Sequence, residues 1–450
     1  MKFSHKISPK RRQKFREEFI RGIWNPKINN WRDIIEDLIC ISRKRLNNKF
    51  ILFRLQMNIL TDIIQNTQAI DAYKQKLDDF SKQEGKGLIS KEDAKFFESE
   101  IMANNIINRA LKEVVDGIVW RLFNYNRAFL YLLADKEPMG PIRMDKGMIE
   151  SLYELADIFL DPENIAMLND ISNFLRIGDI TKIGSDGNIE LIEVKSSGGR
   201  GGRRIQRQKQ KMSELVEFIN TGIREYDGRK LTIYDSNITQ VHYFQNLLDA
   251  LNRSQNKGYD SILIGDHLIL EIVNYHKIDD INNAIEYFKK RHESTKERWD
   301  KNDDKVFTFF LSDKMEYSRN FIPYSILPYD SNMCADIITG KMMIRSLINI
   351  SEIMRKIQKS GWQIIDSFFL KTEEEIKKLE GQDVKDLTML KIRKSGYNIN
   401  IPHHYFGKLV YELWSPKSMI EVFEEGYNRD QHKDYDAYLL NFLDDQRIWK

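Results

Sequence analysis

Apolar residues recur with the period of an α-helix through most of the first third of the chain. Two long patterns of this kind, at 31–68 and 96–133, predict amphipathic helices separated by a polar stretch. A shorter pattern at 145–160 predicts another helix, and the Pro- and Gly-containing segment 136–141 predicts a boundary before it. Residues 1–140 are therefore expected to form a helical N-terminal region.

Beyond residue 177 the pattern becomes strand-like. Two apolar segments flank a turn rich in Gly, Asp and Asn, which is typical of a β-hairpin. A two-residue loop in this turn would pair Asp179 with Val194. A three-residue loop at 185–187, with Gly187 at positive φ, would instead pair Asp179 with Glu193. Three-residue loops favour glycine in the last position, so the second register is the expected one.

The hairpin predicts a compact group of charged side chains. Successive residues of a strand face opposite ways, so Glu193 and Lys195 share a face, and the expected register adds Asp179. Two adjacent carboxylates repel each other unless a cation lies between them, and a hard divalent cation with oxygen ligands is the usual solution. Magnesium bound in this way also takes a phosphate oxygen and activates water. The alternative is a surface hairpin with a solvated ion pair.

The segment after the hairpin is strongly basic. From residue 195 to residue 211 there are seven Lys or Arg residues and no acidic residue. The spacing predicts a helix from Arg203 onward, with an apolar face made of Ile205, Met212, Leu215, Val216 and Ile219. The opposite face comprises Arg203, Gln206, Arg207 and Gln210. Together with Arg200 in the preceding glycine-rich loop, this face is expected to contact a nucleic-acid backbone; a solvated helix face is the alternative.

Asp179, followed after the hairpin by Glu193-Val194-Lys195, resembles the motif of the PD-(D/E)XK nuclease superfamily, with Gly178-Asp179 in place of the family's Pro-Asp. The resemblance covers roughly residues 150–234 and not the flanks. It implies a restriction-endonuclease-like core, in which helices pack on a mixed sheet. It also implies that Asp179, Glu193 and the Val194 carbonyl bind Mg²⁺, for which Mn²⁺ can substitute, while Lys195 positions the nucleophilic water.

The same resemblance implies two further contributors and one further strand. A glutamate on the helix before the first core strand often completes the metal site of the family, and Glu150 and Glu154 are the candidates. Glu154 is slightly favoured because it lies within the apolar pattern. A glutamine on the helix after the E-x-K strand would be Gln206 or Gln210, which the sequence does not separate. Segment 230–234 would continue the sheet of the hairpin.

The remainder of the chain carries no comparable motif. Segment 261–273 predicts a second hairpin with Asp266 and Glu271 but no lysine near the glutamate, so it is expected to be structural. Further expected elements are a strand at 306–311, a helix at 341–359, and a mixture of short strands and helices over 362–450. No Walker loop, GxSxG elbow, HExxH or dinucleotide fingerprint occurs in the sequence.

Composition limits the classes of protein that fit. The chain has 450 residues, of which 41% are apolar and 30% charged, as expected of a globular protein with sizeable cores. The formal net charge is only +3, so the case for nucleic acid rests on the local basic run. Cys40 and Cys334 are far apart and favour a reducing compartment. The sequence shows no signal peptide or membrane span, which favours a cytoplasmic protein.

These patterns predict an α/β protein with three parts: the helical region 1–140, a nuclease core at 141–328, and a helical or α/β region at 329–450. The predicted activity is Mg²⁺-dependent hydrolysis of double-stranded DNA by an (endo)nuclease, in analogy with restriction or anti-phage defence enzymes, and the choice between internal sites and ends stays open. The alternative is a catalytically silent nucleic-acid-binding or scaffolding module with the same fold. RNA as the substrate stays open, and so does a homo-oligomer, because no dimer segment is identified.

Overall fold

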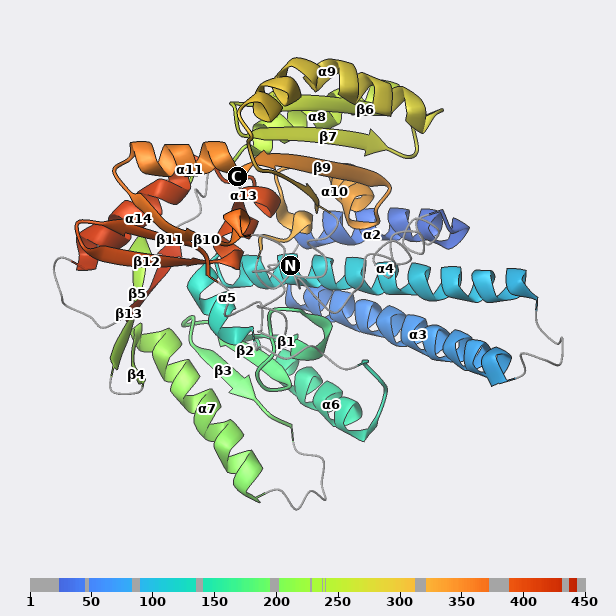
Figure 1. Cartoon of the computed structure of the whole chain (residues 1–450). Helices are drawn as coiled ribbons and strands as arrows, with labels where there is room; N and C mark the ends of the chain where they lie inside the picture. The colour runs from blue at the N-terminus through green and yellow to red at the C-terminus, as the bar shows by residue number, and fades with distance from the viewer. Residues whose placement is uncertain are drawn as a thin grey trace.

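The fold mixes helices and small sheets, as the sequence predicted (Figure 1). The computed structural model describes residues 24–44, 48–82, 90–134, 141–194, 202–226, 229–236, 238, 240–311, 321–371, 388–430 and 437–442. Among the helices of these ranges, none has the length and apolar content that crossing a bilayer requires. The mixed α/β class is therefore confirmed, and the finer expectation of a restriction-endonuclease-like core depends on how the strands pair.

The N-terminal region is helical, and its helices are shorter than the sequence pattern suggested. They are α2 (Pro26–Lys44), α3 (Lys49–Lys82), α4 (Lys91–Leu122) and α5 (Arg127–Leu133). The pattern at 96–133 is interrupted where Asn124 and Tyr125 take φ values of 48° and 59°, which ends one helix. Asn126 then caps the next helix by accepting a hydrogen bond from the Phe129 N–H. Helices α3 and α4 lie side by side (Figure 1).

The expected hairpin belongs to a three-stranded antiparallel sheet. Its strands are β1 (Asn164–Leu168), β2 (Ile180–Gly184) and β3 (Ile189–Ile192), in the order β1-β2-β3. Helix α6 (Lys146–Leu160) precedes β1, and a short 3₁₀ turn, η1 (Asn169–Ile171), follows it. On the free side of β1, the Gln56 side chain of α3 donates to the Ala166 carbonyl and accepts from the Leu168 N–H, at 3.0 and 2.8 Å. Gln56 thus bonds to the strand edge as another strand would.

The expected continuation of this sheet by 230–234 is wrong. Helix α7 (Gly202–Thr221) leads into β4 (Ile223–Tyr226) and β5 (Arg229–Ser236), so the strand itself is present. In the described part of the chain, however, β5 bonds to β4 and to β13 (Ala437–Phe442), in the order β13-β5-β4, and β13 runs parallel to β5. The reason is that a segment far along the sequence supplies the neighbour of β5. A restriction-endonuclease-like core sheet is therefore not confirmed.

A four-stranded antiparallel sheet lies above the N-terminal helices in the view of Figure 1. Its strands, in spatial order, are β6 (Tyr259–Ile264), β7 (Leu268–Asn274), β9 (Met342–Asn349) and β8 (Val306–Phe310). Helices α8 (Phe244–Lys257), α9 (Ile281–Lys301) and α10 (Ser331–Ile338) pack against it. The second hairpin and the strand at 306–311 are thus confirmed.

The helix expected at 341–359 is half wrong. Its first half is β9, in which burial alternates along Met342–Asn349, and only its second half is helical, as α11 (Ile350–Lys359). The last part of the chain mixes strands and helices as expected. It comprises β10 (Gln363–Ser367), β11 (Thr388–Lys394), β12 (Tyr397–Pro402), α13 (His403–Tyr411) and α14 (Pro416–Asp430), with the 3₁₀ turns η4 (Tyr324–Ile326) and η5 (Phe368–Leu370).

One apolar cluster runs through all three regions that the sequence suggested. It includes Ile63 of α3, Leu168 of β1, Ile348 of β9 and Val422 of α14. Trp120 of α4 is fully buried within it. The regions therefore share a core, and their division at residues 140 and 328 stays a prediction.

Candidate functional site

The register of the first hairpin is the one that the sequence predicted. Ile180 pairs with Ile192, and the Gly184 N–H donates to the Asn188 carbonyl at 2.9 Å, which leaves a three-residue loop at 185–187. Gly187 has a φ of 80°, as this loop requires. Continued by one residue, the register sets Asp179 opposite Glu193.

Asp179 lies at the end of the ladder and turns toward the opposite strand. Its N–H donates to the Ile192 carbonyl at 2.8 Å, although Ile192 is already the register partner of Ile180, so the backbone leaves the regular ladder here. One carboxylate oxygen, Oδ2, accepts a hydrogen bond from the Val194 N–H at 2.7 Å. The Asp179 carboxylate therefore lies against the peptide that joins Glu193 to Val194.

Gly178, which precedes Asp179, adopts a backbone conformation that is closed to proline. Gly178 has a φ of 76°, a conformation that proline, fixed near −65°, cannot adopt. A Cβ at this position would also lie 2.9 Å from the Ile192 carbonyl oxygen and 3.1 Å from Cε of Met212. Met212 belongs to the buried face of α7, so this helix packs directly on the turn that carries Asp179.

Asn169 holds this turn in place, and sequence reasoning missed it. Its side chain is 1% exposed and donates to the carbonyls of Ile177 and Gly178 at 2.9 and 3.0 Å. Its Oδ1 accepts from the Thr181 hydroxyl at 2.8 Å, and its backbone N–H donates to the Asp179 carbonyl at 2.9 Å. The only signal in the sequence was a polar Asn-Asp pair directly after an apolar strand.

Asp170, the next residue, adds a second negative charge near Asp179. Burial raises the pKa of Asp179, the hydrogen bond from Val194 opposes this rise, and the charge of Asp170 adds to it. Burial likewise raises the pKa of Asp170, while Lys112 of α4 and Arg176 oppose the rise. The pKa of Lys112 is itself lowered to about 8, chiefly by burial. Carboxylates and cations thus meet at the sheet edge next to the hairpin end.

The oxygen donors at the hairpin end fit Mg²⁺. Asp179 and Glu193 each carry a carboxylate at this end of the hairpin, and the first of them accepts a hydrogen bond from the Val194 N–H. Within the described ranges, no three His, Cys, Asp or Glu side chains come together as a metal-binding group. A two-carboxylate donor set still suits magnesium, which keeps several waters and is commonly bound through one or two carboxylates.

The two glutamates proposed for α6 occupy different environments. Glu154, the favoured candidate, is exposed. Glu150 is half-buried: Lys146 lies 3.7 Å from its Oε1, and no hydrogen-bond partner within the described ranges reaches its buried Oε2. Burial therefore favours Glu150 over Glu154, the reverse of the sequence-based preference.

The basic helix is present as α7, and its apolar face is confirmed by the burial of Met212, Leu215 and Ile219. Gln210 is exposed and donates to Glu214 of the same helix at 3.0 Å, so it points along the helix surface and not into the hairpin. The side chains of the remaining candidates lie outside the part of the chain that the structure describes. Arg203, Gln206 and Arg207 lie on α7 with side chains outside the described part, and Lys195 and Arg200 lie wholly outside the described residues.

The second hairpin is structural, as expected. Buried Glu271 forms a salt bridge with Arg345 of β9, and Lys296 of α9 lies 3.7 Å from its other oxygen. Exposed Asp266 forms a salt bridge with Arg298 at 2.8 Å. Its carboxylates thus bind elements of their own sheet and helix layer, which makes Asp266 a suitable control for Asp179.

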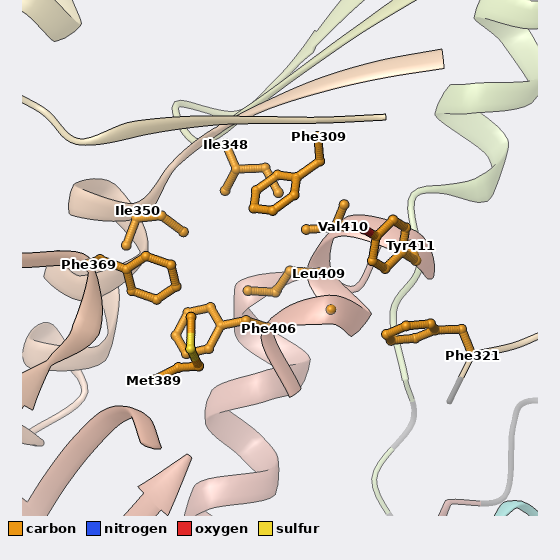
Figure 2. A pocket seen from close by; sticks show the side chains of 11 residues that line it. Phe309, Phe321, Ile348, Ile350, Phe369, Met389, Phe406, Leu409, Val410 and Tyr411 are labelled. Carbon is orange, nitrogen blue, oxygen red and sulfur yellow. The ribbon is translucent and has the colours of Figure 1, made fainter. Parts of the chain in front are cut away.

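An enclosed cavity elsewhere in the molecule is chemically inert. It has a volume of about 30 Å³ and lies between β8, β9, β11 and α13 (Figure 2). Figure 2 shows Phe309, Ile348, Phe369 and Phe406 pointing into it. A cavity of this size with apolar walls offers water too few polar partners and offers a reaction no catalytic group.

No protein-family model matches the chain, and no curated protein or solved structure matches it. The resemblance to PD-(D/E)XK nucleases therefore stays an expectation from the sequence of the hairpin and its flanking helices. Of these features, the structure describes the register, the Asp179–Val194 hydrogen bond and the packing of α7.

Proposed function

We propose that the chain is a metal-dependent nuclease that hydrolyses the phosphodiester bonds of DNA at the end of the β2–β3 hairpin. The observation that supports this best is the 2.7 Å hydrogen bond from the Val194 N–H to the Asp179 carboxylate. It fixes that carboxylate against the backbone N–H of the residue that follows Glu193, which supports a shared site for Asp179 and Glu193.

Each residue of this site has a separate role. Asp179 and Glu193 would hold Mg²⁺, with the Val194 carbonyl as a third oxygen donor. The bound ion would polarise the phosphate and lower the pKa of a water. Lys195 would orient that water and stabilise negative charge on the phosphate. Asn169 acts as a positioning residue, because it fixes the 177–178 backbone from which Asp179 projects.

The raised pKa of Asp179 supports a cation-binding role. Burial is the main cause of the raised pKa of Asp179, and repulsion by the charge of Asp170 adds to it. A bound divalent cation would remove this repulsion and bring the pKa of Asp179 down. Metal affinity should accordingly weaken as the pH falls toward the raised pKa, since the ligand must be deprotonated.

DNA is proposed as the substrate because a phosphodiester backbone is the natural partner of the basic segment at 195–211. A role in restriction or anti-phage defence would be in keeping with such an enzyme, by analogy only. A catalytically silent DNA-binding module is the outcome that the following experiment would reveal if cleavage fails.

The test is cleavage of supercoiled plasmid DNA in Mg²⁺, compared with the same reaction in EDTA. Asp179→Asn, Glu193→Gln and Lys195→Ala should each lower the rate at least about a hundred-fold. Asp266→Asn, in the look-alike hairpin, should cut as wild type does. Full activity of Asp179→Asn and Glu193→Gln would refute the proposed site, and DNA binding without any wild-type cleavage would favour the silent module.

Metal binding can be followed without activity. Mg²⁺ at about a hundred times its dissociation constant should stabilise the wild-type fold by about 2.7 kcal/mol through mass action. Asp179→Asn and Glu193→Gln should lose most of this gain, because each removes a ligand. Equal stabilisation of wild type and both variants would place the metal elsewhere.

A further inference from the structure

The connection from β1 to β2, residues 169–179, ends at Asp179 and is anchored on helix α4 by a buried carboxylate. This carboxylate belongs to Asp116, which is 0% exposed. Its Oδ1 accepts hydrogen bonds from the Ser172 hydroxyl at 2.8 Å and from the Asn173 N–H at 2.7 Å. Its Oδ2 accepts from the Asn173 side chain at 2.8 Å. One side chain of α4 therefore holds two consecutive residues of the connection.

Backbone hydrogen bonds continue from this anchor toward the hairpin. The N–H groups of Phe174 and Leu175 donate to the Ser172 Oγ, at 3.0 and 3.3 Å. The Arg176 N–H donates to the Leu133 carbonyl at 3.0 Å. The next two carbonyls are those to which the side chain of Asn169 donates. The 172–176 loop is thus held from α4 up to the turn that carries the candidate metal ligand.

The surroundings of Asp116 disfavour its charge. Glu113, one turn earlier on α4, is 1% exposed and adds a second buried carboxylate, whose Oε1 accepts from the Tyr324 N–H of η4 at 2.6 Å. Burial raises the pKa of Asp116 to about 7, the charge of Glu113 adds to the rise, and the bonds from Ser172 and Asn173 oppose it. The other charged groups near this place, on α4 and on the β1–β2 connection, are Lys112, Asp170 and Arg176.

We propose that Asp116 is a positioning residue for Asp179, and that its ionisation controls how readily the 172–176 loop opens away from α4. The protonated carboxyl fits the closed loop, because Oδ1 keeps both of its donors and the Asn173 amide can turn over to accept the new proton. The ionised carboxylate carries a charge into the core, and opening the loop lets water solvate that charge. The loop should therefore be held most firmly at acidic pH and open more often as the pH rises to neutrality.

Proton linkage gives the size of this effect. A carboxyl group in water has a pKa of about 4, so over this range the opened loop releases a proton that the closed loop keeps. The opening equilibrium should rise about ten-fold or more between pH 5 and pH 7 and level off above the raised pKa of Asp116. The role toward Asp179 rests on the proposed nuclease site, whereas the opening of the loop can be measured without metal.

The experiment is hydrogen exchange of the full chain without metal, followed by mass spectrometry of peptides that cover the 172–176 loop. The N–H groups of residues 173–176 all donate in the closed loop, so their exchange reports its opening. After correction for the intrinsic exchange rate at each pH, the wild-type loop should open about ten-fold or more as often at pH 7 as at pH 5.

Three variants test the cause of this pH dependence. Asp116→Asn should abolish the rise, because the amide keeps the shape of the carboxyl but does not ionise. Glu113→Gln should move the point at which the rise levels off to lower pH, because it removes the second negative charge. Asp266→Asn, which removes an exposed carboxylate from the other hairpin, should behave as wild type. An equal opening of the wild-type loop at both pH values, or a rise that persists in Asp116→Asn, would overturn the proposal.

Mg²⁺ binding tests the positioning role. Asp116→Ala removes the acceptor of all three bonds and should lower Mg²⁺ affinity about ten-fold, whereas the isosteric Asp116→Asn should retain it. Circular dichroism would confirm that both variants fold, and Asn173→Ala, which removes only the bond to Oδ2, replaces Asp116→Ala if the latter does not. Unchanged Mg²⁺ affinity in the folded variant would overturn the role toward Asp179. A wild type that Mg²⁺ does not stabilise would overturn the proposed nuclease site and this role with it, while hydrogen exchange would still decide the pH-controlled opening.

Discussion

Replacing Asn169 with alanine tests how the candidate site is held together. The substitution removes two hydrogen bonds to the carbonyls of Ile177 and Gly178 and one from the Thr181 hydroxyl. A buried group that loses its partner costs about 1–3 kcal/mol, and here both carbonyls are half-buried, so water replaces part of the loss. We expect Asn169→Ala to lower the free energy of unfolding by about 2–4 kcal/mol.

Thr181→Val is the matched variant, because it removes only the hydroxyl and leaves both bonds from Asn169 to the turn. It should lower the free energy of unfolding by about 1 kcal/mol. Asn398→Ala at an exposed position of β12, where the side chain accepts one bond from Arg393, should change it by less than about 0.5 kcal/mol. Urea unfolding followed by circular dichroism measures all three variants. Their midpoints can be compared if the slope of the free energy of unfolding against urea concentration is the same in each.

Asn169→Ala and Thr181→Val should also differ in how strongly Mg²⁺ stabilises them. Stabilisation by Mg²⁺ should shrink in Asn169→Ala but persist in Thr181→Val, because only the first releases the backbone that carries Asp179. If Asn169→Ala were no less stable than Thr181→Val and bound Mg²⁺ equally well, the bonds to the turn would contribute nothing, and the assigned positioning role would be refuted.

Three further outcomes are expected. Arg127→Met should lower the free energy of unfolding by about 3–5 kcal/mol, because it removes the guanidinium that lies 2.8 Å from the fully buried Glu412 carboxylate; an unfolding midpoint equal to that of wild type would contradict this. Burial lowers the pKa of His292 to about 4, so between about pH 6.5 and pH 4 the unfolded chain binds a proton that the folded chain does not bind. The free energy of unfolding should therefore fall as the pH drops through this range. In a plot of melting temperature against pH, His292→Gln should flatten the slope. A Cβ at Gly187 would meet no atom within 4 Å, so Gly187→Ala should lower the free energy of unfolding by about 1–2 kcal/mol through the positive φ alone. Gly178→Ala should lower it by more in urea unfolding, because its Cβ would also meet a carbonyl oxygen at 2.9 Å.

Local rules predicted the hairpin, and non-local contacts decided what surrounds it. The glycine in the loop predicted the register that pairs Ile180 with Ile192, which would set Asp179 opposite Glu193 if it continued by one residue. The partner of β5 could not be predicted in the same way, because 437–442 pairs with 231–236 across most of the C-terminal half of the chain. The alternating burial of β9 likewise depends on the strands on either side of it, and its sequence alone resembled the helix that follows.

The site itself was predicted only in part for a related reason. Repeated apolar spacing marks an element, but a single polar residue such as Asn169 or Asp170 gives no periodic signal. Its role depends on a turn that folds back eight residues later. The apolar pattern also did not predict that Glu150 is half-buried and Glu154 exposed, because the packing of neighbouring elements determines which flank of α6 is covered.

The parallel pairing of β13 with β5 has a consequence for how the chain folds during its synthesis. β5 leaves the ribosome long before 437–442 does, so one of its edges stays open while the whole four-stranded sheet and the β10–β12 sheet are being made. An open edge invites pairing with the strands of another nascent chain. Slow translation of the last third would prolong this exposure, and a chaperone that shields extended segments would find its binding site at β5.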